Sequence, residues 1–262
     1  MQEPSALGRI VQLVRDLRKR CPWDRAQTRA TLRPYLVEEA LELDQALAHK
    51  DPAKIREELG DVLLHVAFQV VLGEEEGDFG AEDITRSVER KMWRRHPHLF
   101  TEHGDEIAAS ARENTWERTK LDEADSGEPS VLDGLPPTLP ALLMAYRLQE
   151  RAAGVGFDWP DSEGPLEKVR EEVEELSAEV TAPERNQEDV EDEIGDLFFA
   201  AVNLARKLNI DPRTAMERAN AKFERRFRRV EEVARERGVD LGHASLEELD
   251  EIWDEVKTER YG

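Results

Sequence analysis

Cysteine is nearly absent from the 262-residue chain, which contains Cys21 alone. A single cysteine excludes an internal disulfide and any zinc site built from several cysteines, and it favours a reducing compartment. Long hydrophobic runs are lacking as well: the most apolar stretch, residues 62–72, is interrupted by His65 and Gln69 and is too short to span a bilayer. The first 20 residues alternate charged and apolar side chains, unlike a signal peptide. We therefore expect a cytoplasmic protein that does not enter a membrane.

Positive charge is scarce, with 37 Lys and Arg residues against 59 Asp and Glu residues and a formal net charge of −22. This excess of carboxylate repels a nucleic-acid backbone, and no long basic stripe offsets it, so we expect no nucleic-acid partner. A small phosphorylated substrate is compatible with such a chain only if a divalent cation accompanies it. Most of the acidic residues are expected to solvate exposed helix faces.

Period-2 runs of β-branched residues are also missing, so no sheet is expected. Apolar residues recur instead at helical spacing. The starts of some helices are marked by Asp51-Pro52, by Asp211-Pro212, and by Ser245 followed by Glu248 in a capping box. We predict an all-α fold with helices at residues 7–17, 34–47, 52–72, 82–95, 108–121, 141–153, 165–181, 187–208, 212–236 and 246–258.

The same motifs occur twice in the same order, at a spacing of roughly 131 to 137 residues. The matching pairs are EEALE at 38–42 with EEVEE at 171–175, ELGD at 58–61 with EIGD at 193–196, KMWRR at 91–95 with KFERR at 222–226, and Trp116 and Lys120 with Trp253 and Lys257. This order indicates an internal duplication. We predict two tandem helical-bundle modules, residues 1–122 and 141–262, joined by a linker at 123–140 that is rich in Asp, Ser, Gly and Pro.

Each module carries Glu-Glu-x-x-Glu on one helix and Glu-x-x-Asp on the next, and residues three apart share a helix face. At about 100° per residue, the buried stripe of the second module is predicted to comprise Leu166, Val169, Val173, Leu176, Val180, Ile194, Leu197, Ala201 and Leu208. The carboxylates fall on the flank of this stripe. If the two helices pack antiparallel, four carboxylates converge at the edge of the shared core: Glu172, Glu175, Glu193 and Asp196.

Such convergence favours a cation. Two carboxylates about 4 Å apart repel by about 4 kcal/mol at an effective dielectric near 20, so four together require a bound cation or protonation. Ligands with only oxygen donors suit a hard ion, and Mg²⁺ is the usual partner of a polyphosphate, with Mn²⁺ as the alternative. Single motifs of this kind are usually solvated surface in a Glu-rich chain. The presence of both motifs in both modules argues for a metal site.

These motifs, the later Lys-x-x-x-Arg and the duplication resemble the MazG family, all-α nucleotide pyrophosphohydrolases related to the dimeric dUTPases. The resemblance covers nearly the whole chain and includes the segments CPWDRAQT, RRHPHLF, GFDW and NLARKL. It implies binding of ATP and other nucleoside triphosphates and their hydrolysis to a monophosphate and pyrophosphate, a housecleaning of the nucleotide pool. It also implies a homodimer. The Mg²⁺ ligands would be Glu172, Glu175, Glu193 and Asp196, with a second possible site at Glu39, Glu42, Glu58 and Asp61.

The neighbours of the two acidic sets differ. One turn before Glu172 stands Lys168, where the first module has Tyr35; two turns after Asp196 stands Asn203, where the first module has Phe68. A triphosphate needs cationic and hydrogen-bonding partners besides the metal, so these differences favour the second module as the catalytic one. One difference points the other way, because Lys54 precedes Glu58 where Asp189 precedes Glu193.

Further substrate contacts are predicted on the last two helices. Lys222 and Arg226 share a helix face and are expected to bind phosphate oxygens, unless they only form surface ion pairs. Trp253 is expected to stack on the base, with Lys257 near phosphate, although a core anchor is an equal alternative. Asp189 and Asn203 would complete the substrate site. Water would attack the α-phosphorus while Lys168, Lys222 and Arg226 neutralise the leaving group, and Glu171 is a candidate general base.

Two other classes remain open. A ferritin-like di-iron bundle also gathers Glu on paired helices, but it uses Glu-x-x-His, and no histidine here has a Glu three residues before it. A non-catalytic, metal-binding helical scaffold is the second alternative. P-loop nucleotidases are excluded, because the chain has no GxxxxGK[ST] motif.

Overall fold

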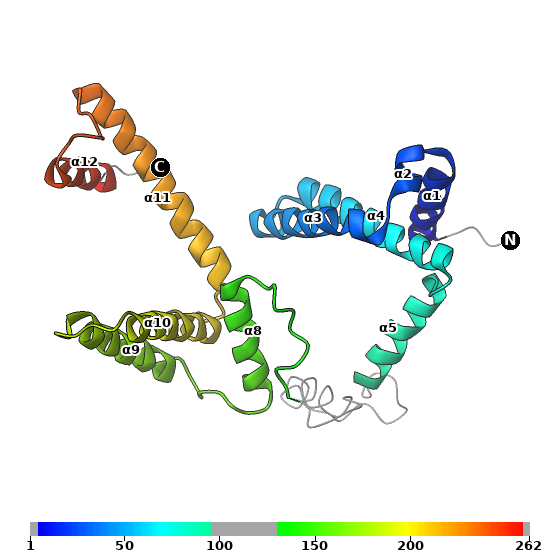
Figure 1. The fold of residues 1–262 in the computed structure, drawn as a ribbon, viewed down its shortest axis with the longest axis horizontal. Helices are drawn as coiled ribbons and strands as arrows, with labels where there is room; N and C mark the ends of the chain where they lie inside the picture. Colours follow the sequence, from blue (N-terminus) through cyan, green and yellow to red (C-terminus); the bar gives the residue numbers. More distant parts are fainter. Residues whose placement is uncertain (1–4, 96–129, 259–262) are drawn as a thin grey trace. The chain divides into compact units, whose positions relative to one another are not determined.

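The computed structural model describes residues 5–95 and 130–258, and every regular element in these residues is a helix (Figure 1). The all-α prediction is therefore confirmed. The predicted helix at 108–121, with Trp116 and Lys120, lies outside the described residues. In the described part of the chain no helix is long and apolar enough to cross a membrane.

Two compact units make up the chain, residues 1–107 and 108–262, here called the N-terminal and C-terminal units. Each contains one pair of helices that carries the two acidic motifs, in agreement with the predicted duplication. The bounds of the predicted linker, 123–140, fall partly outside the described residues and stay a prediction.

The N-terminal unit contains five described helices: α1 (Ala6–Arg20), α2 (Pro22–Ala26), α3 (Arg29–His49), α4 (Pro52–Glu76) and α5 (Ala81–Arg95). The predicted start of α3 at Pro34 is wrong. Thr28 caps the helix earlier, since its hydroxyl accepts the Thr31 N–H at 3.2 Å while Thr31 Oγ1 accepts the Thr28 N–H at 2.9 Å. The five-residue α2 is too short to show the periodicity on which the prediction rested.

Packing of α1 and α3 on α4 forms the core of this unit. Its buried members are Val14, Leu32, Ala67, Phe68, Val71 and Leu72. Three consecutive glutamates at the end of α4 pair with arginines, Glu74 with Arg15 at 2.8 Å, Glu75 with Arg18 at 2.7 Å and Glu76 with Arg29 at 2.8 Å. The Arg18 guanidinium is buried and also donates to two backbone carbonyls, so this pairing fixes α1 and α2 against α4.

The C-terminal unit contains α8 (Ala141–Gly154), α9 (Glu163–Thr181), α10 (Gln187–Lys207), α11 (Pro212–Arg237) and α12 (Leu246–Thr258). These bounds lie within about two residues of the prediction, because the predicted caps operate. Asp211 accepts the Arg213 N–H at 2.8 Å, and Ser245 accepts the Glu248 N–H at 3.2 Å. Figure 1 shows α9 and α10 side by side and α12 packed on the end of α11. The latter contact buries Val230, Val233, Ala234, Ile252 and Val256.

Part of the predicted buried stripe is wrong. Val173 is 50% exposed in the single chain, and Leu166, Val180, Ile194 and Leu208 are exposed as well. Among the described helices α9 packs chiefly on α10. Their buried or half-buried side chains include Pro165, Val169, Glu172, Leu176, Val190, Glu193, Leu197 and Ala200. These form a row with 3–4 spacing that lies one position around from the predicted one. Glu172 and Glu193 therefore lie on the covered side of their helices, whereas Glu175 and Asp196 are exposed.

Trp159, in the loop between α8 and α9, packs closely against Gly164 at the start of α9. A Cβ atom at this position would lie 2.0 Å from Cδ1 of Trp159. We expect Gly164→Ala to lower the melting temperature of the protein, since the indole must move away from the helix. In a Trp159→Leu background the same substitution should cost much less, and thermal unfolding of the four proteins of this double-mutant cycle measures the difference. Equal costs in both backgrounds would contradict the contact.

Candidate metal centre

Three carboxylates meet in the contact between α9 and α10. Glu172 and Glu175 of α9 and Glu193 of α10 each offer one oxygen, and these oxygens lie within 4.8 Å of one another. We call this group the C-terminal carboxylate cluster. Glu172 is only 3% exposed, whereas Glu175 stands at the open side. Asp196, the fourth predicted ligand, is not within this close group, although its charge acts on Glu193.

Within the C-terminal carboxylate cluster, the pKa of Glu193 is shifted. Burial raises the pKa of its carboxyl above the ordinary value of 4.5, and the neighbouring charges of Glu175, Glu172 and Asp196 raise it further. Its Oε2 atom is buried and has no hydrogen-bond partner among the described residues. A buried carboxylate oxygen without a donor is costly, so this atom is suited to a cation that the protein itself does not provide.

Lys168 lies beside the cluster, as the sequence predicts. Its Nζ atom is 2.6 Å from Glu172 Oε1 and 2.9 Å from Glu171 Oε1. Hydrogen bonds to these two carboxylates raise the pKa of Lys168, so the ammonium stays charged at neutral pH. Glu171, the predicted general base, is largely exposed and faces Lys168 rather than the three cluster oxygens.

The residues of the cluster fit a hard divalent cation. They supply only carboxylate oxygens, one of which is buried and without a partner, and the convergence of three acids is unfavourable without positive charge. A single lysine at one edge offsets part of this charge. The group can therefore hold a metal ion with Lys168 placed to contact an anionic ligand of that ion.

The raised pKa of Glu193 predicts a specific pH dependence of stability. Without metal, the protonated carboxyl is favoured in the folded state, so folded Glu193 contributes stability near pH 4.5 that is lost as the pH rises through its raised pKa. Glu193→Gln removes this charge. We expect the melting temperature of the metal-free variant to exceed that of the metal-free wild type at pH 8, and the gap to close near pH 4.5.

The exposed Glu167, which pairs with Arg170 on the same helix, provides the matched control for this measurement. Glu167→Gln should leave the pH profile of the melting temperature almost unchanged, because an exposed ion pair contributes little. If Glu193→Gln differs from the wild type in melting temperature by the same amount at pH 8 and near pH 4.5, the pKa of Glu193 is not raised in the folded protein.

A similar group lies in the N-terminal unit, where Glu39 of α3 and Glu58 and Asp61 of α4 bring oxygens within 4.8 Å of one another. We call it the N-terminal carboxylate cluster. Burial raises the pKa values of Glu39 and Glu58, and neighbouring acids add to both shifts. Glu42, predicted as the fourth ligand, lines an adjacent groove together with Glu58 and Lys54.

The two clusters differ in the cationic side chains beside them, as the sequence indicates. At the N-terminal cluster, Lys54 approaches Glu58 only to 3.9 Å and contacts Glu57 at 2.8 Å. The position that corresponds to Lys168 is occupied by Tyr35, which stacks on His65 with ring centroids 6.4 Å apart. The N-terminal cluster therefore has an aromatic pair where the C-terminal cluster has an ammonium group.

Asp189 and Asn203 both lie on α10, Asp189 before Glu193 and Asn203 after it, near the end of the helix. Asn203 is 8% exposed, and its Oδ1 accepts two hydrogen bonds from Arg206, whose guanidinium also pairs with Asp158. This network fastens the loop after α8 to the end of α10. Asp189 lies in the first turn of α10 at an exposed position.

The remaining predicted residues lie on α11 and α12. Trp253 stacks at an angle on Phe223, with centroids 5.5 Å apart, and Lys257 Nζ lies 5.8 Å from the centre of the indole ring. Lys222 and Arg226 are on the same part of α11 as Phe223. Among the described helices α11 and α12 pack chiefly on each other and α9 packs chiefly on α10, so these four side chains lie outside the helix contact that holds the C-terminal carboxylate cluster.

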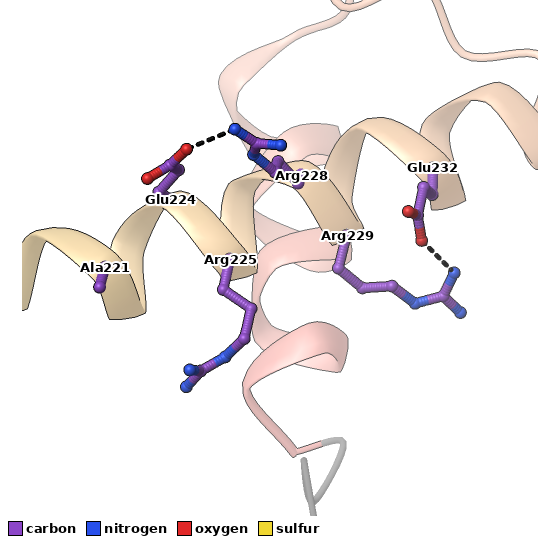
Figure 2. Close-up of a pocket in the computed structure, with 6 residues that line it drawn as sticks. All are labelled: Ala221, Glu224, Arg225, Arg228, Arg229 and Glu232. Carbon is purple, nitrogen blue, oxygen red and sulfur yellow. Dashed lines mark hydrogen bonds and ion pairs between the residues drawn. The ribbon is translucent and has the colours of Figure 1, made fainter. Parts of the chain in front are cut away.

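Sequence reasoning missed the aromatic part of this surface. Phe223 stacks on Phe227 as well as on Trp253, and both phenylalanines are exposed. Their spacing of four residues, on a helix expected to bind substrate, was the available signal. Elsewhere on α11 a shallow hollow is lined by Arg225, Arg228 and Arg229, as Figure 2 shows. Arg228 pairs with Glu224 and Arg229 with Glu232, so glutamates of the same helix compensate this basic surface.

The sequence is similar to those of known proteins over most of its length. The MazG nucleotide pyrophosphohydrolase domain matches residues 27–100 and 162–231. A nucleoside triphosphate pyrophosphohydrolase of Escherichia coli (strain K12) is 41% identical over 258 residues, which cover 98% of each chain. The nucleoside triphosphate pyrophosphohydrolase/pyrophosphatase MazG of Thermotoga maritima is 42% identical over 250 residues, 95% of this chain and 94% of its own. The uncharacterized protein YabN of Bacillus subtilis is 44% identical over 252 residues, 95% of this chain but 51% of its own length.

The two segments that match the domain contain one carboxylate cluster each. The first, 27–100, includes Glu39, Glu58 and Asp61, and the second, 162–231, includes Glu172, Glu175 and Glu193. This double match agrees with the internal duplication found in the sequence, and the near-complete coverage of two relatives confirms the predicted resemblance. The chain belongs to the MazG nucleotide pyrophosphohydrolase family.

Proposed function

We propose that the protein hydrolyses nucleoside triphosphates to nucleoside monophosphates and pyrophosphate in its C-terminal unit, with Mg²⁺ held by the C-terminal carboxylate cluster. The observation that carries this proposal is the partner-free buried Oε2 of Glu193 within a group of three carboxylates beside Lys168. The names of the two long relatives and the family of the chain support the same activity. Mn²⁺ is expected to replace Mg²⁺, because both prefer oxygen ligands.

Mg²⁺ would supply positive charge to the phosphate oxygens and make water more acidic. Glu172, Glu175 and Glu193 would hold the ion, and Asp196, whose charge acts on Glu193, is proposed as a fourth ligand. Lys168 would exchange its contact with Glu171 for a phosphate oxygen, since its ammonium has three donors and stands at the edge of the cluster. Glu171, released from this ion pair, would be free to accept a proton from water.

The phosphate and base contacts of α11 and α12 require a second copy of the chain in this proposal. Among the described helices of one chain, α9 packs chiefly on α10 and α12 on α11, so Lys222, Arg226, Trp253 and Lys257 lie outside the helix contact that holds the C-terminal carboxylate cluster. The helices α9 and α10 also carry exposed apolar side chains, which we call the apolar stripe: Leu166, Val173, Val180, Ile194 and Phe198. Pairing of two such stripes would bury them in a four-helix bundle, so we propose a homodimer.

The first test identifies the products. Purified full-length protein is incubated with a panel of canonical, non-canonical and damaged nucleoside triphosphates and Mg²⁺, and the products are separated by chromatography. We expect monophosphate and pyrophosphate in equal amounts and no activity in EDTA. Formation of diphosphate and orthophosphate would contradict cleavage between the α and β phosphates. Absence of any hydrolysis would leave the non-catalytic scaffold as the function. The panel also measures base preference and tests the role in clearing the nucleotide pool.

We also propose that the protein acts in the cytoplasm, where its proposed substrates would be found. The single cysteine is consistent with that compartment.

A further inference from the structure

A cavity of about 420 Å³ lies where α8 meets the start of α11. This size is within the range of small-molecule sites. It is lined by residues from α8 and by a continuous segment between α10 and α11: Leu143, Tyr146, Arg147, Asn209, Ile210, Asp211, Pro212 and Arg213. None of these residues belongs to either carboxylate cluster. The cavity is therefore a separate feature of the C-terminal unit.

The lining divides into an apolar part and a cationic part. Leu143, Ile210 and the ring of Tyr146 provide apolar surface, and Arg147 and Arg213 provide guanidinium groups. Arg147 pairs with Glu150 of the same helix, so a phosphate bound here would compete with that carboxylate. Arg213 is oriented by Asp211, whose Oδ2 lies 3.0 Å from Nη2. An aromatic ring beside two arginines suits a planar ligand that carries an anionic group, because the ring stacks on the ligand while guanidinium binds phosphate.

Backbone hydrogen bonds fix one wall of the cavity. The Ile210 N–H donates to the Ala205 carbonyl at 2.8 Å, and the Asn209 N–H donates to the Arg206 carbonyl at 3.0 Å. Asn209 has a φ of 55°, the left-handed conformation that ends a helix in this pattern. Asp211 then caps α11, accepting the Arg213 N–H at 2.8 Å. The corner is thus preformed, which lowers the entropic cost of binding a ligand.

We propose that this cavity binds a nucleoside monophosphate, with the base against Tyr146 and the phosphate between Arg147 and Arg213. The choice of a monophosphate among phosphorylated aromatic compounds rests on the proposed function, of which it is the product. The ligand would contact α8 on one side and the corner at residues 209–213 on the other.

Calorimetric titration of full-length protein with AMP in EDTA tests the proposal without hydrolysis. We expect saturable binding that Glu172→Gln preserves and that Tyr146→Ala and Arg147→Ala each weaken by more than about tenfold. Tyr146→Phe keeps the ring and should retain binding, and Arg170→Ala, which removes an exposed arginine of α9, should have no effect. Adenosine and inorganic phosphate, which have only the ring or only the anion, should each bind more than about tenfold more weakly than AMP.

Three results would overturn the site: no saturable AMP binding at millimolar concentration, loss of binding in Glu172→Gln, or unchanged binding in both Tyr146→Ala and Arg147→Ala. Loss in Glu172→Gln would place AMP at the C-terminal carboxylate cluster. Far-UV circular dichroism checks that each variant is folded, and if Tyr146→Ala is not, the pair of Arg147→Ala and Tyr146→Phe decides. Failure of the proposed hydrolysis would leave this measurement unaffected, because it depends on binding alone.

Discussion

Glu172→Gln is expected to lower kcat for triphosphate hydrolysis by more than about 100-fold. Glu172 is almost fully buried, shares the cluster with Glu175 and Glu193, and is the carboxylate that Lys168 contacts at 2.6 Å. The substitution keeps the size of the side chain but removes one charged metal ligand and the partner of that lysine. Loss of such a ligand costs more than loss of a group that only supports one, which itself costs about 10- to 100-fold. Initial rates of pyrophosphate release over a range of Mg²⁺ concentrations measure the effect.

Glu39→Gln is the matched control, because Glu39 has the same place in the N-terminal carboxylate cluster. We expect it to change kcat by less than about threefold, since Tyr35 stands where the C-terminal carboxylate cluster has Lys168. Thermal unfolding shows whether either variant has lost stability. An equal loss of activity from both substitutions would contradict the assignment of catalysis to the C-terminal unit.

The sequence predicted the helices well where local chemistry decides their ends. Asp51, Asp211 and Ser245 each accept a backbone N–H at the expected helix start. The exceptions are α2, which is too short to have a period, and the start of α3, where the Thr28–Thr31 capping box overrides the proline signal. The ends of α1 and α4 were also predicted too early, at residues 17 and 72, whereas the helices end at Arg20 and Glu76. Helix ends depend on a few adjacent residues, so a single sequence contains the information needed to place them.

It was harder to predict which side of each helix is buried. Periodicity identified the row of Leu166, Val173 and Val180 as buried, yet α9 turns Glu172 toward α10 and leaves that row exposed in the single chain. A helix with apolar residues on more than one side has no unique buried face in its sequence alone. The convergence of Glu172, Glu175 and Glu193 was nevertheless predicted. Both acidic motifs lie within one helical turn of the contact between α9 and α10, whether the predicted or the observed row of side chains forms that contact.

Contacts between residues distant in sequence were the least predictable. The stack of Tyr35 on His65 and the pairing of Asp158 with Arg206 depend on how two helices approach each other. Neither pair has a fixed spacing that a motif could report. The assignment of Lys222 and Arg226 to the substrate came from their spacing on one helix face and from the repeated motif, neither of which says which other helix α11 packs against; among the described helices that is chiefly α12.

The second large effect is expected from Val173→Glu on the apolar stripe. Val173 is 50% exposed in the single chain, so the folded unit should accept the substitution with little change in stability. In the proposed dimer the same side chain is buried against the partner copy, where an unpaired carboxylate is strongly unfavourable. We expect sedimentation to show a dimer for the wild type and a monomer for Val173→Glu. Hydrolysis should fall by more than about 100-fold, because the monomer lacks phosphate contacts from a second copy.

Leu246→Glu is the matched control for this experiment. Leu246 is 82% exposed at the start of α12, outside the apolar stripe, and a glutamate is well tolerated in the first turn of a helix. This variant should remain dimeric and active. If Val173→Glu stays dimeric, the apolar stripe is not the interface; if it becomes monomeric and keeps full activity, one chain holds a complete site. Val173→Glu that is monomeric, folded and inactive would instead show that the carboxylate cluster needs a second chain to act on its substrate.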